Sequence, residues 1–186
     1  MGKLLDAITP ELEQFITEQK LFFVATAPLD PNGHVNCSPK GLDSFRILDP
    51  VTIVYQDLTG SGVETIAHVN ENKRITILFC AFNGPPFILR LYGNGEVVTS
   101  SHSDFETFQK LFPSRIGVRS YIKVRLSRVT TSCGYGVPLF EFKSDRDTML
   151  KWAEHKGEEG VIAYRREKNQ TSIDGLPGIT DDELSS

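Results

Sequence analysis

Two long apolar segments joined by a tight turn constrain the fold more than any other feature of the sequence. Residues 75–82 are almost continuously apolar, and residues 87–98 form a second long apolar segment that contains Gly93 and Gly95. The turn between them, Asn83-Gly84-Pro85-Pro86, consists of residues that favour chain reversal. The pattern predicts two long antiparallel strands with both faces buried, because a strand with one exposed face would alternate apolar and polar residues.

One small core cannot cover both faces of these two strands. We therefore expect one face to line the interior of a sheet and the other to meet the same surface of a second copy, as a two-fold interface requires. Such a homodimer interface would bury more than about 2,000 Å². Arg90 lies within the second strand, and a buried arginine needs an anion. Either a carboxylate of the protein or a ligand in the dimer cleft would supply it.

The rest of the chain carries both strand and helix patterns. Strand patterns cover residues 21–26, 34–38, 51–56 and 120–129, and helix patterns begin at Pro10 and cover residues 64–72, 103–112, 147–156 and 158–168. Together with the two long segments, this makes six strands with helices inserted between them. The sequence predicts one α+β domain over residues 1–186, a six-stranded antiparallel split β-barrel with surrounding helices and a helical C-terminal extension from about residue 145.

Charge and cysteine content exclude several classes of function. The net charge of −4 comes from interspersed acidic and basic residues, so no nucleic-acid-binding surface is expected. No apolar run approaches the roughly 20 residues of a membrane span, and no N-terminal signal pattern is found, so we expect a cytoplasmic protein. The three cysteines lack a CxxC pair and the four histidines are scattered, which predicts neither disulfides nor a metal site.

A glycine-rich segment after the strand at residues 51–56 carries the first candidate binding groups. In Thr59-Gly60-Ser61-Gly62 the glycines let backbone N–H groups approach a ligand, and the two hydroxyls add further donors. The helix expected from residue 64 would add its positive end. The pattern indicates a phosphate-binding loop, and the alternative is a plain turn built from the same residue types.

A polar strand face supplies the second set of candidates. Val35 and Cys37 alternate with Asn36 and Ser38, and Lys40 lies just beyond them. This face would be turned either toward a ligand or toward solvent.

Taken together, these segments resemble a known family. The order is His34-Val35-Asn36-Cys37-Ser38-Pro39-Lys40-Gly41, a strand, Asp57-Leu58-Thr59-Gly60-Ser61-Gly62, a short helix, Asn72-Lys73-Arg74 and two long strands. This order resembles that of the pyridoxamine 5'-phosphate oxidase-like FMN-binding split-barrel family. Four further stretches are similar to one subgroup of it: Phe79-Cys80-Ala81-Phe82-Asn83-Gly84-Pro85-Pro86, Leu89-Arg90-Leu91-Tyr92-Gly93, Thr131-Ser132-Cys133-Gly134-Tyr135-Gly136-Val137-Pro138 and Ser172-Ile173-Asp174-Gly175-Leu176-Pro177-Gly178. The resemblance implies a split barrel, a homodimer and one FMN in each of two clefts at the subunit interface.

The sequence departs from the oxidases of that family at the phosphate site and toward the C-terminus. Val35 or Asn36 stands where those enzymes carry a phosphate-binding arginine, and Ser61-Gly62 stands near their Arg-Lys pair. Phosphate binding would then depend on Lys40, hydroxyls and backbone N–H groups, with Arg74 or Arg90 adding charge. The C-terminal arginine and histidine segment that holds the vitamin phosphate has no counterpart after Trp152, so the vitamin reaction itself is not expected.

We therefore expect an FMN-dependent oxidoreductase whose substrate and electron donor the sequence does not identify. The flavin would carry the redox chemistry, and Lys40 or Arg90 near its pyrimidine edge would stabilise the reduced anion. No general acid or base stands out, and Cys37 and Cys133 lack a neighbouring base that would make them nucleophiles. The alternatives are a flavin carrier or sensor without turnover, and an enzyme that holds a deazaflavin or a haem in the same cleft. The expected cofactor-binding residues are Asn36, Ser38, Lys40, Thr59, Ser61, Gly62 and Arg90.

Overall fold

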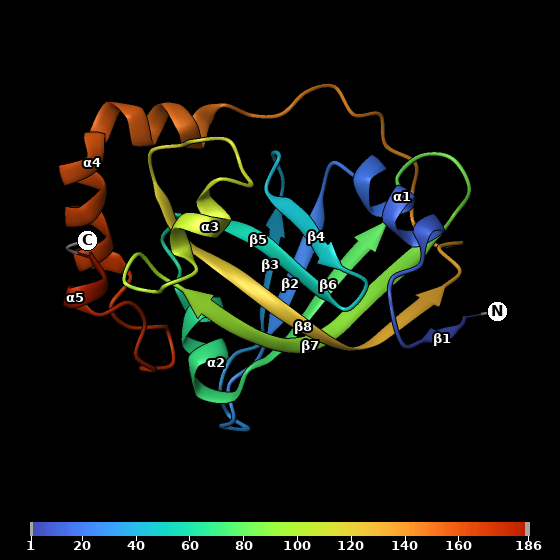
Figure 1. Ribbon diagram of the computed structural model, residues 1–186, viewed down its shortest axis with the longest axis horizontal. Helices are drawn as coiled ribbons and strands as arrows, with labels where there is room; N and C mark the ends of the chain where they lie inside the picture. The colour runs from blue at the N-terminus through green and yellow to red at the C-terminus, as the bar shows by residue number, and fades with distance from the viewer. Residues whose placement is uncertain (1, 185–186) are drawn as a thin grey trace.

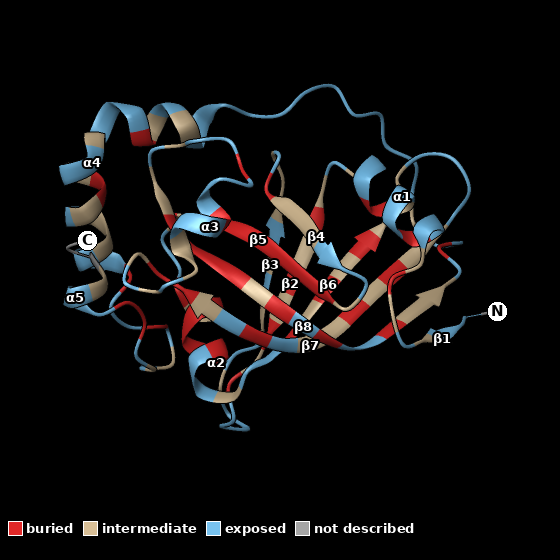
Figure 2. Ribbon diagram, in the orientation of Figure 1, coloured by how far each residue is buried: buried red, intermediate tan, exposed pale blue. Residues whose placement is uncertain are grey.

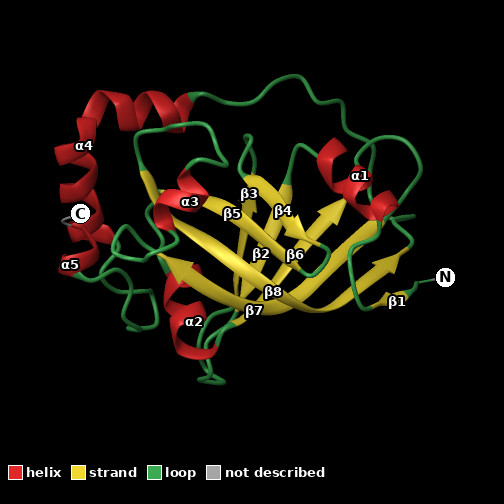
Figure 3. Ribbon diagram, viewed as in Figure 1, coloured by secondary structure: helices red, strands yellow, loops and turns green. Residues whose placement is uncertain are grey.

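The computed structural model describes residues 2–184, and its centre is a curved antiparallel sheet of eight strands (Figure 1, Figure 3). The strands are β1 (Leu4–Leu5), β2 (Phe22–Thr26), β3 (Asn36–Lys40), β4 (Phe45–Asp49), β5 (Thr52–Leu58), β6 (Arg74–Cys80), β7 (Ile88–Val98) and β8 (Val118–Ser132). Their hydrogen-bonded order is β3, β2, β6, β7, β8, β5, β4, and β1 pairs with β8 outside this path. Because β3 and β4 form the two ends, the barrel is split and not closed.

The α+β class and the antiparallel split-barrel sheet confirm the prediction, while the strand count differs from it. All six expected strands are present. β4 is an additional strand, which pairs with β5 across a tight turn at Pro50, and β1 is another, only two residues long. The sequence of β4 does not alternate and runs almost directly into β5. For this reason the sequence pattern does not distinguish the two strands.

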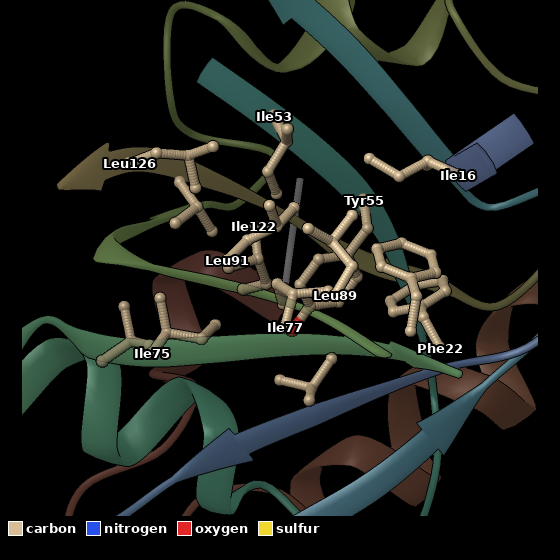
Figure 4. Packing of buried hydrophobic residues seen from close by; sticks show 14 of the residues in the cluster. Ile16, Phe22, Ile53, Tyr55, Ile75, Ile77, Leu89, Leu91, Ile122 and Leu126 are labelled. Carbon is tan, nitrogen blue, oxygen red and sulfur yellow. The ribbon is translucent and has the colours of Figure 1, made fainter. Parts of the chain in front are cut away.

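The interior of the sheet is filled by branched and aromatic side chains (Figure 4). These side chains come from five strands, β2 and β5 to β8, and from helices α1 (Pro10–Glu18) and α2 (Glu64–Asn72); α1 closes one end of the core with Ile16. Fully buried members include Ile53, Tyr55, Ile77, Leu89, Leu91 and Ile122. The core therefore lies inside the curve of the sheet.

β6 and β7 form the hairpin that the two apolar segments predict, with Ile77 opposite Leu91 and Leu78 opposite Arg90. Within one chain each strand buries a single face. Ile77 and Leu91 are buried, whereas Leu78 and Arg90 on the outward face are half-buried. The expected burial of both faces is thus not met in the single chain, and the outward face, which carries Leu78 and Ile88 besides Arg90, is left half-exposed.

The remaining helices are α2 (Glu64–Asn72), α3 (Phe105–Gln109), α4 (Thr148–Lys168) and α5 (Asp181–Leu184). α4 has two arms, because Gly157 takes the non-helical angles φ 65° and ψ 175°. The two arms correspond to the two helices predicted over residues 147–156 and 158–168, and Figure 1 shows them meeting at a corner. Across residues 2–184, no helix combines the length and apolar character needed to cross a bilayer.

An extended segment, residues 133–147, leads from the end of β8 to α4 without helix or strand. It crosses above the sheet in Figure 1, and most of it is exposed, as the pale blue in Figure 2 shows. This path carries α4 to the side of the molecule where β5 leads into α2. Residues more than one hundred positions apart come into contact there, such as Thr59 and Arg165 with a separation of 106.

Candidate functional site

The loop between β5 and α2 comprises residues 59–63, where the sequence predicts phosphate binding. Thr59 fixes its start, because its N–H and its hydroxyl both donate to the Gly117 carbonyl oxygen, at 2.8 and 2.9 Å. Thr59 Oγ1 in turn accepts from Arg165 Nε at 2.8 Å. The 59–63 loop is therefore anchored by specific contacts, unlike a free surface turn.

Beyond Thr59 the loop presents hydrogen-bond donors. Within residues 2–184 no acceptor pairs with the backbone N–H groups of Gly60, Ser61 or Gly62, and Ser61 is exposed. A Cβ placed on Gly60 would meet no atom within 4 Å, so the space above this residue is open. α2 begins directly after the loop, and the positive end of a helix favours anions. The arrangement suits a phosphate group at Gly60, whereas the Glu64 carboxylate lies against Gly62 and opposes an anion there.

A buried ionic cluster lies beside the loop. Asp57 Oδ1 accepts from Lys40 Nζ at 2.9 Å, and Asp57 Oδ2 accepts from Arg119 Nε at 2.8 Å. Burial by itself opposes ionisation of Asp57, but the charges of Arg119 and then Lys40 outweigh it and hold the pKa of this carboxyl far below its usual range. Lys40 ends β3 and Asp57 lies on β5, so this ion pair joins the two sides of the split barrel.

The cluster carries more positive than negative charge. Arg165 of α4 donates from Nη2 to the Val118 carbonyl oxygen at 2.7 Å. Burial, reinforced by the charge of Arg119, lowers the pKa of Arg165 to about 10, so it remains a cation at neutral pH. The cations Lys40, Arg119 and Arg165 therefore lie near one carboxylate, Asp57. This excess positive charge borders the 59–63 loop and favours an anionic ligand there.

Asn36 and Ser38 lie on the half-buried face of β3, as predicted, but their polar groups are engaged within the chain. Asn36 Nδ2 donates to the hydroxyl oxygens of Thr26 and Thr65, at 3.1 and 2.9 Å. Asn36 Oδ1 accepts from Ser38 Oγ at 2.9 Å. This network ties β3 to the first turn of α2, so the face is neither a solvated strand nor a row of free donors.

Arg90 lies apart from these residues in the single chain. It is opposite Thr130 in the β7–β8 pairing, whereas the 59–63 loop lies near Val118 at the other end of β8. Arg90 Nη1 donates to Ser132 Oγ at 3.0 Å, and no carboxylate in residues 2–184 forms an ion pair with it. The intrachain salt bridge that was one expectation for Arg90 is therefore not found in the described chain.

Two cavities border the 59–63 loop. The larger has a volume of about 860 Å³ and reaches from the loop to α4; we call it the α4 pocket. The smaller, of about 390 Å³, lies between the loop and β3 and includes Glu64 in its lining. Of the predicted cofactor-binding residues, Lys40 and Thr59 line the α4 pocket, Asn36, Ser61 and Gly62 line the smaller cavity, and Ser38 and Arg90 line neither.

Sequence reasoning missed three polar residues that hold the site together: Arg119, Arg165 and Asn169. Arg119 and Arg165 contact Asp57 and Thr59 as described, and Asn169 Nδ2 donates to the Gly60 carbonyl oxygen at 3.0 Å. These pairs are separated by 62, 106 and 109 residues in the chain, so no local spacing reveals them. The only sequence signal was that Arg119 is a basic residue directly before the strand predicted over residues 120–129.

Comparison with known proteins defines the class to which this fold and site belong. The sequence profile of the family described as pyridoxamine 5'-phosphate oxidase matches residues 8–133. The pyridoxamine 5'-phosphate oxidase family protein ustO of Aspergillus flavus is 36% identical over 191 residues, which cover 94% of this chain and 76% of the relative. The chain therefore belongs to the pyridoxamine 5'-phosphate oxidase family, as the sequence motifs predict.

Solved structures share the fold. HupZ of Group A Streptococcus is 28% identical, with 66% of this chain and 91% of HupZ covered and a TM-score of 0.54. A putative pyridoxamine 5'-phosphate oxidase of Lactobacillus delbrueckii is 17% identical, with 67% and 94% covered and a TM-score of 0.54. At 17% identity, the similarity to the Lactobacillus delbrueckii protein concerns the fold alone. α4 lies beyond the residues that the family profile matches.

Proposed function

We propose that the protein binds FMN and acts as an FMN-dependent oxidoreductase. Membership of the family supports the binding of a flavin. The 59–63 loop supports the choice of FMN over riboflavin. Its N–H groups at Gly60, Ser61 and Gly62 are unpaired within residues 2–184, and it borders the excess positive charge around Asp57. A phosphate group would meet these donors already in place. FMN carries such a phosphate and riboflavin does not.

Each predicted residue takes a role that its position allows. The backbone of Gly60 and Gly62, with the hydroxyls of Thr59 and Ser61, would bind the phosphate, and Lys40 would add charge beside it. Asn36 and Ser38 would position β3 and α2 around the loop through their own hydrogen bonds. When bound, FMN would supply the hydride-transfer or electron-transfer chemistry, while the protein orients it and excludes water.

A homodimer is the proposed working unit. The outward face of β6 and β7 is only half-buried and includes the apolar residues Leu78 and Ile88, and Arg90 on this face has no carboxylate partner in the described chain. A second copy on this face would bury apolar area and bring Arg90 to an anion in the dimer cleft. Cys37 and Cys133 are exposed free thiols, which favours the reducing cytosol as the working compartment.

Calorimetric titration of the flavin-free protein with FMN and with riboflavin tests the phosphate assignment. FMN should bind at least about tenfold more tightly, since a hydrogen bond to a charged group is worth roughly 1.5 kcal/mol or more. Equal affinity for the two flavins would contradict the assignment. The absorption spectrum of the purified protein separates FMN from haem, which gives a sharp Soret band.

A glycine variant sharpens this test. Gly60→Ala should preserve the fold, because the new Cβ meets no atom within 4 Å, but its methyl group enters the open space above the loop and should weaken FMN without weakening riboflavin. Gly136→Ala is the matched control, since Gly136 is equally open but lies in the extended segment. Loss of FMN affinity in both variants, or in neither, would move the phosphate away from Gly60.

Turnover is tested separately by adding NADH or NADPH to the FMN-loaded protein. Bleaching of the flavin band, followed by recovery with an electron acceptor, is expected of an oxidoreductase. Tight FMN binding without bleaching would instead favour a flavin carrier or sensor.

A further inference from the structure

The C-terminal loop, residues 170–178, holds Asp174 in a defined position. The Ser172 N–H donates to the Leu176 carbonyl oxygen at 2.9 Å, and the Leu176 N–H donates to the Ser172 hydroxyl at 3.1 Å. Gly175 turns the chain with a φ of 80°, in the left-handed region that glycine adopts readily. The loop is therefore closed by its own hydrogen bonds, and Asp174 lies at its tip.

Asp174 contacts His34, which lies in the connection between β2 and β3, through two hydrogen bonds. Asp174 Oδ2 accepts from the His34 backbone N–H at 2.8 Å, and Asp174 Oδ1 lies 2.6 Å from His34 Nδ1. The hydrogen bond from the His34 ring holds the pKa of Asp174 below its ordinary value, so this carboxyl is ionised at neutral pH. Because an ionised carboxylate only accepts hydrogen bonds, the shared proton belongs to His34 Nδ1. The backbone and the ring of His34 are thereby both fixed.

The contact at Nδ1 leaves the second ring nitrogen of His34, Nε2, free to exchange protons. Within residues 2–184 Nε2 has no hydrogen-bond partner, and the side chain is 72% exposed. A carboxylate at Nδ1 fixes the tautomer in which Nε2 is the base, and it stabilises the imidazolium that forms when this base is protonated. His34 therefore has the arrangement of a general acid–base with an orienting carboxylate.

His34 also borders a cavity next to the 59–63 loop. It lines the smaller cavity together with Ser61 and Gly62 of that loop. Of the four histidines, His34 alone lines either of the two cavities that border the loop. The sequence shows no candidate acid or base, because Asp174 follows His34 by 140 residues and only the folded chain brings them together.

We propose that His34 transfers protons to and from a substrate bound in the smaller cavity, with Asp174 as its positioning residue. This inference rests on the proposed FMN-dependent oxidoreduction. It adds a class of substrate, which is an acceptor that gains a proton on oxygen when it is reduced, such as a quinone or a carbonyl compound. It also gives a role to residues 172–178, which the proposed phosphate site does not use.

The proposed step balances in protons and electrons. Reduction of such an acceptor to a hydroquinone or an alcohol needs one hydride, which reduced FMN would supply, and one proton. The new O–H bond forms as the Nε2–H bond of the His34 imidazolium breaks, and His34 is left neutral with its proton on Nδ1. Because the side chain is exposed, solvent is able to restore the proton on Nε2.

Oxidation of the reduced, FMN-loaded protein in a single turnover tests the proton step. The flavin is reduced with dithionite in the absence of oxygen, and the recovery of its absorption is followed after mixing with one of two acceptors. Menadione is a quinone and needs the proton, whereas ferricyanide takes electrons alone. Without His34 Nε2, the rate with menadione should fall about 100-fold relative to the rate with ferricyanide, the lower end of the range for general acid–base catalysis.

His34→Asn is the variant for this test. The asparagine amide is able to donate to Asp174 as Nδ1 does, but it offers nothing in place of Nε2, so the anchoring of the C-terminal loop is kept while the base is lost. His102→Asn is the matched control, because His102 lies 3.4 Å from a carboxylate, that of Glu96, and lines neither cavity. An unchanged ratio of the two rates in His34→Asn, or an equal fall in His102→Asn, would overturn the proton role of His34.

Chemical modification of the flavin-free protein tests the role of Asp174 without FMN or substrate. Diethyl pyrocarbonate acylates neutral imidazole, and mass spectrometry of peptides gives the rate for each histidine. At about pH 8, above the ordinary imidazole pKa near 6.5, His34 should react faster in the unaltered protein than in Asp174→Asn. His155, exposed on α4, is the internal control and should react at the same rate in both.

The outcomes separate this proposal from the proposed function. Equal modification of His34 in the unaltered protein and in Asp174→Asn would overturn the positioning role of Asp174 and leave FMN binding intact. An unchanged ratio of rates in an FMN-loaded His34→Asn variant would likewise overturn the proton transfer alone. Failure of the unaltered protein to bind FMN would overturn the proposed function and, with it, the reduction step assigned to His34.

Discussion

Replacing Asp57 with Asn tests whether buried charge holds the two sides of the split barrel together. Asp57 is fully buried and accepts from Lys40 Nζ at 2.9 Å and from Arg119 Nε at 2.8 Å, and Arg119 Nη2 lies 2.8 Å from the same carboxylate. Asn has nearly the same size but no charge, so Lys40 and Arg119 would lie close together without a counter-charge. A change in stability on this substitution therefore reports the loss of the negative charge and not a change in side-chain volume.

The expected loss of stability follows from these contacts. An ion pair about 4 Å apart is worth roughly 4 kcal/mol at an effective dielectric constant near 20, and Asp57 makes two such pairs. Part of this is offset, because the variant buries no carboxylate and because the Lys40 side chain, 21% exposed, is able to turn toward water. Breaking a buried pair costs about 3–5 kcal/mol, and we expect about 3. The melting temperature should fall by roughly 6–12 °C.

Urea unfolding followed by circular dichroism measures the difference in the free energy of unfolding. Asp43→Asn is the matched control, since the Asp43 side chain is 61% exposed and pairs with Arg46 at the surface. That variant should lose less than about 1 kcal/mol. A loss for Asp57→Asn no larger than for Asp43→Asn would refute the reasoning.

The difference in stability between wild type and Asp57→Asn should depend on pH. The pKa of Asp57 is lower in the folded protein than the ordinary value near 3.9, so its stabilising contribution is complete above that value and is lost as the pH falls below it. The stability difference between wild type and Asp57→Asn should thus be largest at neutral pH and shrink below about pH 4. A difference that stays constant into acid would show that the carboxylate charge is not the cause.

Three further predictions concern the flavin and the assembly. Lys40→Ala should weaken FMN by roughly 1.5–3 kcal/mol in a calorimetric titration, and an unchanged Kd would place the phosphate elsewhere. Arg165→Met removes the donors to Thr59 Oγ1 and the Val118 carbonyl and should weaken FMN about tenfold, while Arg166→Met, half-exposed at the next position, should not; equal effects would contradict the anchoring role. Sedimentation at decreasing concentration, with bound flavin recorded on the same sample, should show dimers that lose FMN as they dissociate. A monomer that keeps its FMN would argue against the shared cleft.

The parts of the fold that the sequence predicts well are those with strong local signals. The hairpin of β6 and β7 follows from two apolar segments and one turn, and the start of α1 follows from Thr9, whose Oγ1 accepts from the Leu12 N–H. Gly157 separates two helical patterns in the sequence and also breaks α4 in the structure. β4 was missed because its five residues carry no alternation and adjoin β5.

The site was predictable only where its groups are close in the sequence. The 59–63 loop combines hydroxyls, glycines and a helix start within a few positions, and Lys40 ends a polar strand face. That Lys40 shares Asp57 with Arg119 could not be foreseen from the sequence. Lys40 lies on β3, which is far from β5 in the strand order, and Arg119 follows Asp57 by 62 residues on β8, whose pairing with β5 no local pattern shows. In the sequence, Arg165 fits the pattern of a solvent-exposed position on a helix, so nothing there marks it as part of the site.

The dependence of the 59–63 loop on α4 has a consequence for the order in which the protein is made. Arg165 follows Thr59 by 106 residues, and Asn169 follows Gly60 by 109. During synthesis the N-terminal parts of a protein emerge and begin to fold first. A nascent chain that has already completed β8 therefore lacks both anchors of the loop. All strands of the sheet precede α4 in the chain, so the strands are able to pair before the 59–63 loop has its anchors.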